Sequence, residues 1–94
     1  MNELASLHAV VYGRVQGVFF RAFVSEQAME LGLTGCVRNL RDREAVELWA
    51  EGERQQLKKL IDYLKVGPPE ARVEKVVTDW SEYSGSYSGF SIRY

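Results

Sequence analysis

Residues 7–21, LHAVVYGRVQGVFFR, run from an alternating apolar segment through a turn with two glycines into a helical pattern. Alternation predicts a strand at residues 7–12, with Leu7, Ala9 and Val11 on its core face. A glycine-bearing turn before a helix directs backbone N–H groups into one space, beside the positive end of the helix dipole. We therefore predict an anion-binding cradle at residues 16–21, where Arg21 adds a planar fork of donors for two phosphate oxygens.

Two helices and four further strands follow from the periodicity of the apolar residues. The helices are predicted at residues 20–31 and 53–66, and Gly67 with two prolines ends the second one. In the second helix the apolar residues stand at i, i+3, i+4 and i+7: Leu57, Leu60, Ile61 and Leu64. The further strands are predicted at residues 34–40, 45–51, 73–80 and 90–94.

This order predicts an α+β fold, a ferredoxin-like α/β sandwich of βαββαβ type with an extra C-terminal strand. Right-handed crossovers would place both helices on one face of a mainly antiparallel sheet. The short polar connection 41–44 predicts that the second and third strands form a hairpin. We also expect the first and third strands to be parallel neighbours.

Length and charge restrict the class of protein. The chain has 94 residues, which predicts a single domain over 1–94. Its net charge is −1, with 12 basic and 13 acidic residues, so no general attraction to nucleic acid or anionic lipid is expected. Cys36 is the single cysteine and no signal peptide is evident, which predicts a cytoplasmic protein, and a monomer is expected.

Two segments of the chain match a known family. GRVQGVFFR at 13–21 resembles the signature of the acylphosphatase family, and GCVRN at 35–39 is similar to that family's other signature. The helix that ends in Gly-Pro-Pro at 67–69 and the final residues FSIRY at 90–94 are similar too. The resemblance covers nearly the whole chain. The first motif is specific, because it joins Val-Gln-Gly-Val to an arginine at a fixed distance.

The resemblance implies hydrolysis of the carboxyl–phosphate bond in small acyl phosphates, with neither metal nor organic cofactor. It implies that Arg21 binds the phosphoryl group and that Asn39 orients the attacking water. It further implies that backbone amides cradle the phosphate oxygens, those of Gln16, Gly17, Val18, Phe19, Phe20 and Arg21. Inorganic phosphate or sulfate is the expected product-like ligand.

The chemistry suits these residue types. An acyl phosphate has a carboxylate as its leaving group, so a strong general acid is less necessary than for an alkyl phosphate. Phosphoryl transfer is catalysed mainly by positioning and by stabilising charge on the equatorial oxygens, which the amides and Arg21 can do. A carboxamide accepts from water and donates but is no strong base, so Asn39 can only orient. We infer that the proton of the water passes to a phosphate oxygen of the substrate.

The chain departs from the family pattern at two places. The family usually has an aromatic residue where Cys36 stands, and a glycine in the turn after the asparagine. Here that turn, LRDREA at 40–45, is one residue longer and has no glycine. The conformation just beyond Asn39 is therefore left open.

Three other functions remain open from the sequence. An anion-binding module on this fold would bind phosphate without hydrolysing acyl phosphates. An RNA-recognition domain shares the order of elements, but Glu47 and Glu51 flank Trp49 on the third strand, the wrong charge for RNA. The fold also occurs as a module of larger carbamoyl-transfer proteins. One histidine, His8, and one cysteine provide no ligand set for structural zinc.

Overall fold

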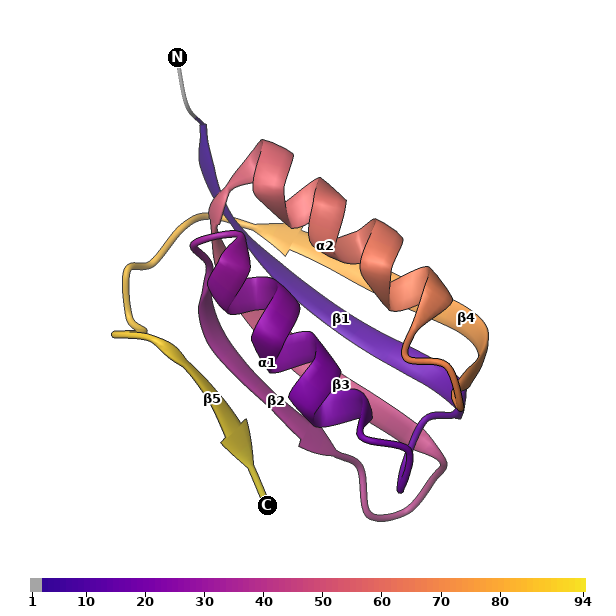
Figure 1. Ribbon diagram of the computed structural model, residues 1–94. Helices are drawn as coiled ribbons and strands as arrows, with labels where there is room; N and C mark the ends of the chain where they lie inside the picture. The colour runs from indigo at the N-terminus through magenta and orange to yellow at the C-terminus, as the bar shows by residue number, and fades with distance from the viewer. Residues whose placement is uncertain (1–2) are drawn as a thin grey trace.

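The computed structural model describes residues 3–94 and contains five strands and two helices. In chain order the elements are β1 (Leu4–Arg14), α1 (Phe20–Glu30), β2 (Thr34–Asn39), β3 (Ala45–Glu53), α2 (Arg54–Val66), β4 (Arg72–Ser81) and β5 (Phe90–Arg93). Both helices lie across the same face of the sheet (Figure 1). The ferredoxin-like α+β architecture predicted from the sequence is confirmed, with element ends shifted by up to three residues.

The five strands form one sheet in the order β4-β1-β3-β2-β5. The prediction that β1 and β3 are neighbours is confirmed, but the prediction that they are parallel is wrong, because they pair antiparallel, with Leu7 opposite Ala50. The crossover through α1 sends β2 in the same direction as β1. The hairpin then reverses the chain, so β3 runs against both strands when it inserts between them. Within residues 3–94, β2 and β5 form the one parallel pair.

The hydrophobic core lies between the helices and the sheet. Strand residues of one parity supply its floor, and Leu7, Val11 and Leu48 are fully buried. Helix α1 packs Phe20, Val24 and Ala28 against it, and α2 adds its buried leucines at helical spacing, Leu57, Leu60 and Leu64. The apolar stripes predicted from the sequence are therefore the packed faces. No helix among residues 3–94 is long and apolar enough to cross a membrane.

Glu51 ties the long connection between β4 and β5 to the sheet. Its carboxylate, only 2% exposed, accepts hydrogen bonds from the backbone N–H groups of Ser84 (3.0 Å) and Gly85 (2.9 Å) and from the Ser84 hydroxyl (2.7 Å). Desolvation raises the pKa of Glu51, but these hydrogen bonds outweigh it, and the net pKa lies below its ordinary value. One buried carboxylate thus holds the segment that leads into β5.

Candidate active site

The predicted cradle is the loop between β1 and α1. Strand β1 is irregular between Tyr12 and Gly13, where its register with β4 shifts, but it stays paired with β4 up to its last residue, Arg14. Gly17 has φ 73°, although a Cβ there would meet nothing within 4 Å. Its backbone angle, rather than lack of space, therefore requires glycine. Val15 and Val18 are buried and fasten the loop to the core.

Helix α1 begins without a side chain to balance its positive end. Phe19 is the N-cap, its φ of 62° is left-handed, and it makes no side-chain capping hydrogen bond. The first turn carries no acidic residue. The first N–H groups of a helix have no acceptor within the helix, so those of Phe20 and Arg21 are available to an anion.

Arg21 is held on one side by the C-terminal segment. Its Nη1 donates to the backbone carbonyl of Arg93 at 3.1 Å, and its guanidinium lies over the Tyr94 ring, 4.6 Å from the ring centroid. A guanidinium has five N–H donors, so donors remain for an anion. Strand β5 therefore orients Arg21. The sequence had marked the ending 90–94 as family-like, yet had assigned it no role.

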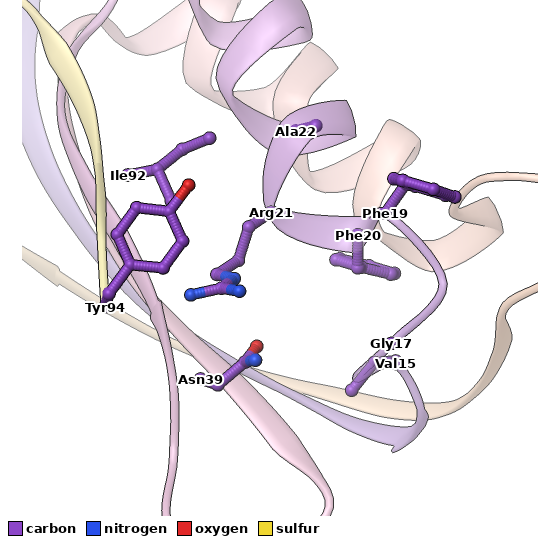
Figure 2. Close-up of a pocket in the computed structure, with 9 residues that line it drawn as sticks. All are labelled: Val15, Gly17, Phe19, Phe20, Arg21, Ala22, Asn39, Ile92 and Tyr94. Atoms are coloured by element: carbon purple, nitrogen blue, oxygen red, sulfur yellow. The ribbon is translucent and has the colours of Figure 1, made fainter.

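Asn39 is the last residue of β2, and its side chain reaches the same cavity as Arg21. This cavity has a volume of about 270 Å³ and lies at the start of α1. Residues from the loop before α1, from α1, β2 and β5, and the final residue Tyr94 line it: Val15, Gly17, Phe19, Phe20, Arg21, Ala22, Asn39, Ile92 and Tyr94. Figure 2 shows the Asn39 carboxamide and the Arg21 guanidinium pointing into a common space. A guanidinium, a carboxamide and free amides can hold an oxyanion and a water together.

Gln16 differs from the other predicted cradle residues. Its backbone N–H donates to the Glu44 carboxylate at 2.9 Å. Its side-chain amide turns away from the cavity toward the turn 40–45 and contacts three backbone carbonyls there. Neither this role of the Gln16 side chain nor any role for Glu44 was predicted from the sequence.

The site has no cluster of metal-ligating side chains. Across residues 3–94, no three His, Cys, Asp or Glu side chains come together in a way that could hold a metal ion. Cys36 is buried in β2, and burial raises the pKa of its thiol despite the opposing charges of Arg93 and Arg38. His8 pairs with Glu47 at 2.7 Å. Neither the cysteine nor the histidine lines the cavity.

The structure is a ferredoxin-like α+β sandwich with a cavity at the start of its first helix, into which Arg21 and Asn39 point. The family model "Acylphosphatase" matches residues 7–92. The chain belongs to the acylphosphatase family and is an enzyme that hydrolyses acyl phosphates.

Individual relatives agree with this assignment. An acylphosphatase of Pyrobaculum islandicum is 48% identical over 90 residues, which are 96% of this chain and 95% of the relative. The structure of an acylphosphatase from Coxiella burnetii superposes with a TM-score of 0.91 at 43% identity, over 98% of this chain and 94% of that one. A full-length HypF, in its phosphate- and nucleotide-bound form, matches with a TM-score of 0.86 at 26% identity, but only over 12% of its length. The two acylphosphatases are thus matched over nearly their whole lengths.

Proposed function

We propose that this enzyme cleaves the carboxyl–phosphate bond of small acyl phosphates by in-line attack of a water molecule that Asn39 orients. In this proposal the phosphoryl group is bound by the Arg21 guanidinium and by the backbone amides of residues 17–21. The amide of Gln16, which we also expected in the cradle, stays on Glu44. The products are a carboxylate and inorganic phosphate, and sulfate is a product-like ligand.

One observation supports the proposal above the others. Arg21 comes from α1 and Asn39 from β2, and both polar groups point into one cavity beside an uncompensated helix start. In-line transfer needs the nucleophile and the leaving group on opposite sides of phosphorus. With water at Asn39, the acyl group leaves on the side away from Asn39. The residues of β2 then have little influence on which acyl group the enzyme accepts.

Charge stabilisation and positioning account for the rate. The guanidinium and the amides face the equatorial oxygens, where charge builds up in the transition state. Asn39 accepts a hydrogen bond from the water and so holds its lone pair toward phosphorus. The proton passes to a phosphate oxygen of the substrate, so no enzyme base takes part. The resemblance to the family further implies a reaction without metal or cofactor. A pH–rate profile that requires an enzyme base near neutrality would contradict this route.

Hydrolysis of benzoyl phosphate by two variants tests the roles. Arg21→Gln and Asn39→Ala should each lower kcat at least about 100-fold, because each removes a preorganised transition-state contact. Arg21→Gln should also weaken inhibition by phosphate, whereas Asn39→Ala should leave it unchanged. Arg38→Gln is the matched control, since Arg38 precedes Asn39 but binds Glu47 at 2.8 Å outside the cavity. Full activity in a folded Arg21 or Asn39 variant would refute the role of that residue.

The remaining properties that we propose follow from composition. We propose a cytoplasmic monomer with no nucleic-acid or membrane partner, supported by a net charge of −1 and a single cysteine. Size-exclusion chromatography with light scattering should give the mass of one chain. A mobility-shift titration with RNA at low salt should show no binding.

A further inference from the structure

We propose that Gln16 is a positioning residue, which acts on the reaction by fixing the turn 40–45 and, through it, the Asn39 carboxamide. The proposal rests on the role of Asn39 proposed above. It assigns to Gln16 a function in its side chain, separate from that of the phosphate cradle.

The Gln16 side-chain amide contacts three backbone carbonyl groups of the turn 40–45. Its Nε2 lies 2.7 Å from the carbonyl oxygen of Leu40, 3.0 Å from that of Arg43 and 2.8 Å from that of Ala45. Two N–H hydrogens serve three acceptors, so one hydrogen bond is shared. The acceptors come from both ends of the turn, so a single side chain fixes its width.

The main chain of Gln16 adds a further hydrogen bond to the same turn. Its N–H donates to the Glu44 carboxylate at 2.9 Å, and the Gly13 N–H lies 3.4 Å from the Glu44 carbonyl oxygen. Side chain and backbone of one residue thus connect the cradle loop to the turn. Any movement of the turn would have to break several of these bonds together.

The turn has few other means of keeping its shape. Residues 41–44 are exposed, and the segment contains no glycine to favour a tight turn. Within it, the Leu40 N–H donates to the Ala45 carbonyl at 3.0 Å and the Ala45 N–H to the Arg43 carbonyl at 2.9 Å. Ala45 is buried and anchors only the far end. The hydrogen bonds of Gln16 therefore join the turn to the loop before α1. The Gly13 N–H and the Tyr12 side chain, which contacts Arg43, join it to β1.

The link to catalysis is one peptide long. Asn39 is immediately followed by Leu40, whose carbonyl accepts the shortest of the Gln16 hydrogen bonds. If that carbonyl moved, the Asn39 backbone and its carboxamide would move with it. A misplacement of about 1 Å in a catalytic group can cost on the order of 100-fold in rate.

Only a donor of this length suits the position. A glutamate has the same shape but would place oxygens against three carbonyl oxygens. A methionine has a similar length and no polar hydrogen. Gln16→Met therefore removes the tie, and Gln16→Glu replaces it with repulsion.

Steady-state hydrolysis of benzoyl phosphate, with inorganic phosphate as inhibitor, tests the proposal. Gln16→Met should lower kcat about 10-fold and Gln16→Glu more, because Asn39 is no longer held in place. The inhibition constant of phosphate should change by less than about twofold, since Arg21 and the amides of 17–21 are untouched. Asp42→Asn is the control in the same turn and should keep the wild-type kcat. A general loss of structure would instead weaken phosphate inhibition as well.

A double mutant distinguishes action through Asn39 from an independent effect. If Gln16 acts through Asn39, Gln16→Met combined with Asn39→Ala should be no slower than Asn39→Ala alone. Losses that multiply, or full activity of Gln16→Met, would overturn the proposal. If Gln16→Met does not fold by circular dichroism, Gln16→Asn tests the same side-chain contacts, because its shorter amide cannot reach all three carbonyl oxygens. An unchanged kcat in that folded variant would overturn the proposal.

The outcomes also separate this proposal from the proposed function. Full activity of Asn39→Ala would remove the water-positioning role and, with it, the premise used here. A severe loss in Asn39→Ala with full activity in Gln16→Met would refute only the role of Gln16.

Discussion

Two loops meet at the active site, and they keep their shapes in different ways. The loop 15–19 contains its own determinants: buried Val15 and Val18, and left-handed backbone at Gly17 and Phe19. The turn 40–45 has four exposed residues and is held largely by hydrogen bonds from Gln16. Figure 1 shows both at the same end of the sheet.

The two halves of the site are therefore positioned by different parts of the chain. The backbone of the phosphate-binding loop is shaped locally, so it should tolerate changes elsewhere, although Arg21 beside it is oriented by the Arg93 carbonyl. The water-orienting half depends on a residue that is distant in sequence. The two halves should therefore be separable by mutation, one through phosphate affinity and the other through kcat.

The largest effect on stability is expected at Glu51. Like Gln16, this residue holds a loop that is distant in sequence, here the loop 82–89 between β4 and β5. Glu51→Gln should lower the free energy of unfolding by about 2 kcal/mol at pH 7, because buried hydrogen bonds to a charged acceptor are lost. Urea unfolding of both proteins measures this difference. An unchanged midpoint would show that the loop 82–89 does not need the carboxylate.

The difference in free energy of unfolding between wild type and Glu51→Gln should become smaller at acidic pH. The pKa of Glu51 is lowered in the folded state, so its contribution is present above the unfolded-state pKa of about 4.3 and is lost as the pH falls through the folded-state value. Unfolding at pH 7 and at pH 3 checks this sign. The stabilities of wild type and Glu51→Gln should lie closer at the lower pH, and a wider gap there would contradict the assignment.

The next largest effect is expected in the loop 15–19, where the backbone angle of Gly17 is changed. Gly17→Ala should cost about 1 kcal/mol of stability, because a Cβ strains a left-handed backbone even in open space. It should also weaken phosphate inhibition, since a relaxed φ at residue 17 turns the neighbouring amides. Thermal unfolding and inhibition assays measure the two effects. Unaltered phosphate affinity would mean that the cradle does not depend on this backbone angle.

At Phe19, in the same loop, the opposite substitution removes a side chain from a residue with left-handed backbone. Its φ is 62° and its side chain is 80% exposed, so the residue has strain with little packing to offset it. Phe19→Gly should raise the free energy of unfolding by about 0.5 kcal/mol, the relief of strain less the added entropy of the unfolded glycine. A lower melting temperature would show that the ring makes stabilising contacts.

The smallest effect is expected for a side chain of the turn itself. Arg43 pairs with Asp42 at 3.1 Å, but both are largely exposed, and such pairs contribute little. Arg43→Ala should leave the midpoint of urea unfolding and kcat near their wild-type values, because Gln16 contacts the Arg43 carbonyl rather than its side chain. A large loss of kcat or stability would show that the Arg43 side chain, rather than its backbone carbonyl, holds the turn in place.

The sequence allowed most of the fold to be predicted, because its apolar periods are clear. The stripe of α2 and the alternation of β1 and β3 became the buried faces. The direction of β3 relative to β1 was predicted wrongly, although the hairpin and the crossover together already determine it. The site was harder. The location of Arg21 and Asn39 in one cavity followed the motifs, whereas the contacts of Gln16 with 40–45 had no local signal.

The contacts that could not be predicted from the sequence are long-range hydrogen bonds of side chains. Hydrogen bonds between side chains and distant carbonyls, such as those of Gln16 and of Arg21 with Arg93, leave no periodic pattern in the chain. They depend on which loops the sheet brings together. Glu44 shows the same limit, since an exposed glutamate in a polar turn has no feature that marks it as an acceptor for the Gln16 N–H.

A crystal structure with bound phosphate or sulfate is the most direct test of the central claim. We predict the anion on the amides of residues 17–21, with the Arg21 fork on two of its oxygens and Asn39 within hydrogen-bond reach of a water opposite the leaving side. Gln16 should remain on the turn and on Glu44. An empty cavity, or an anion bound with Asn39 turned away from it, would contradict the account.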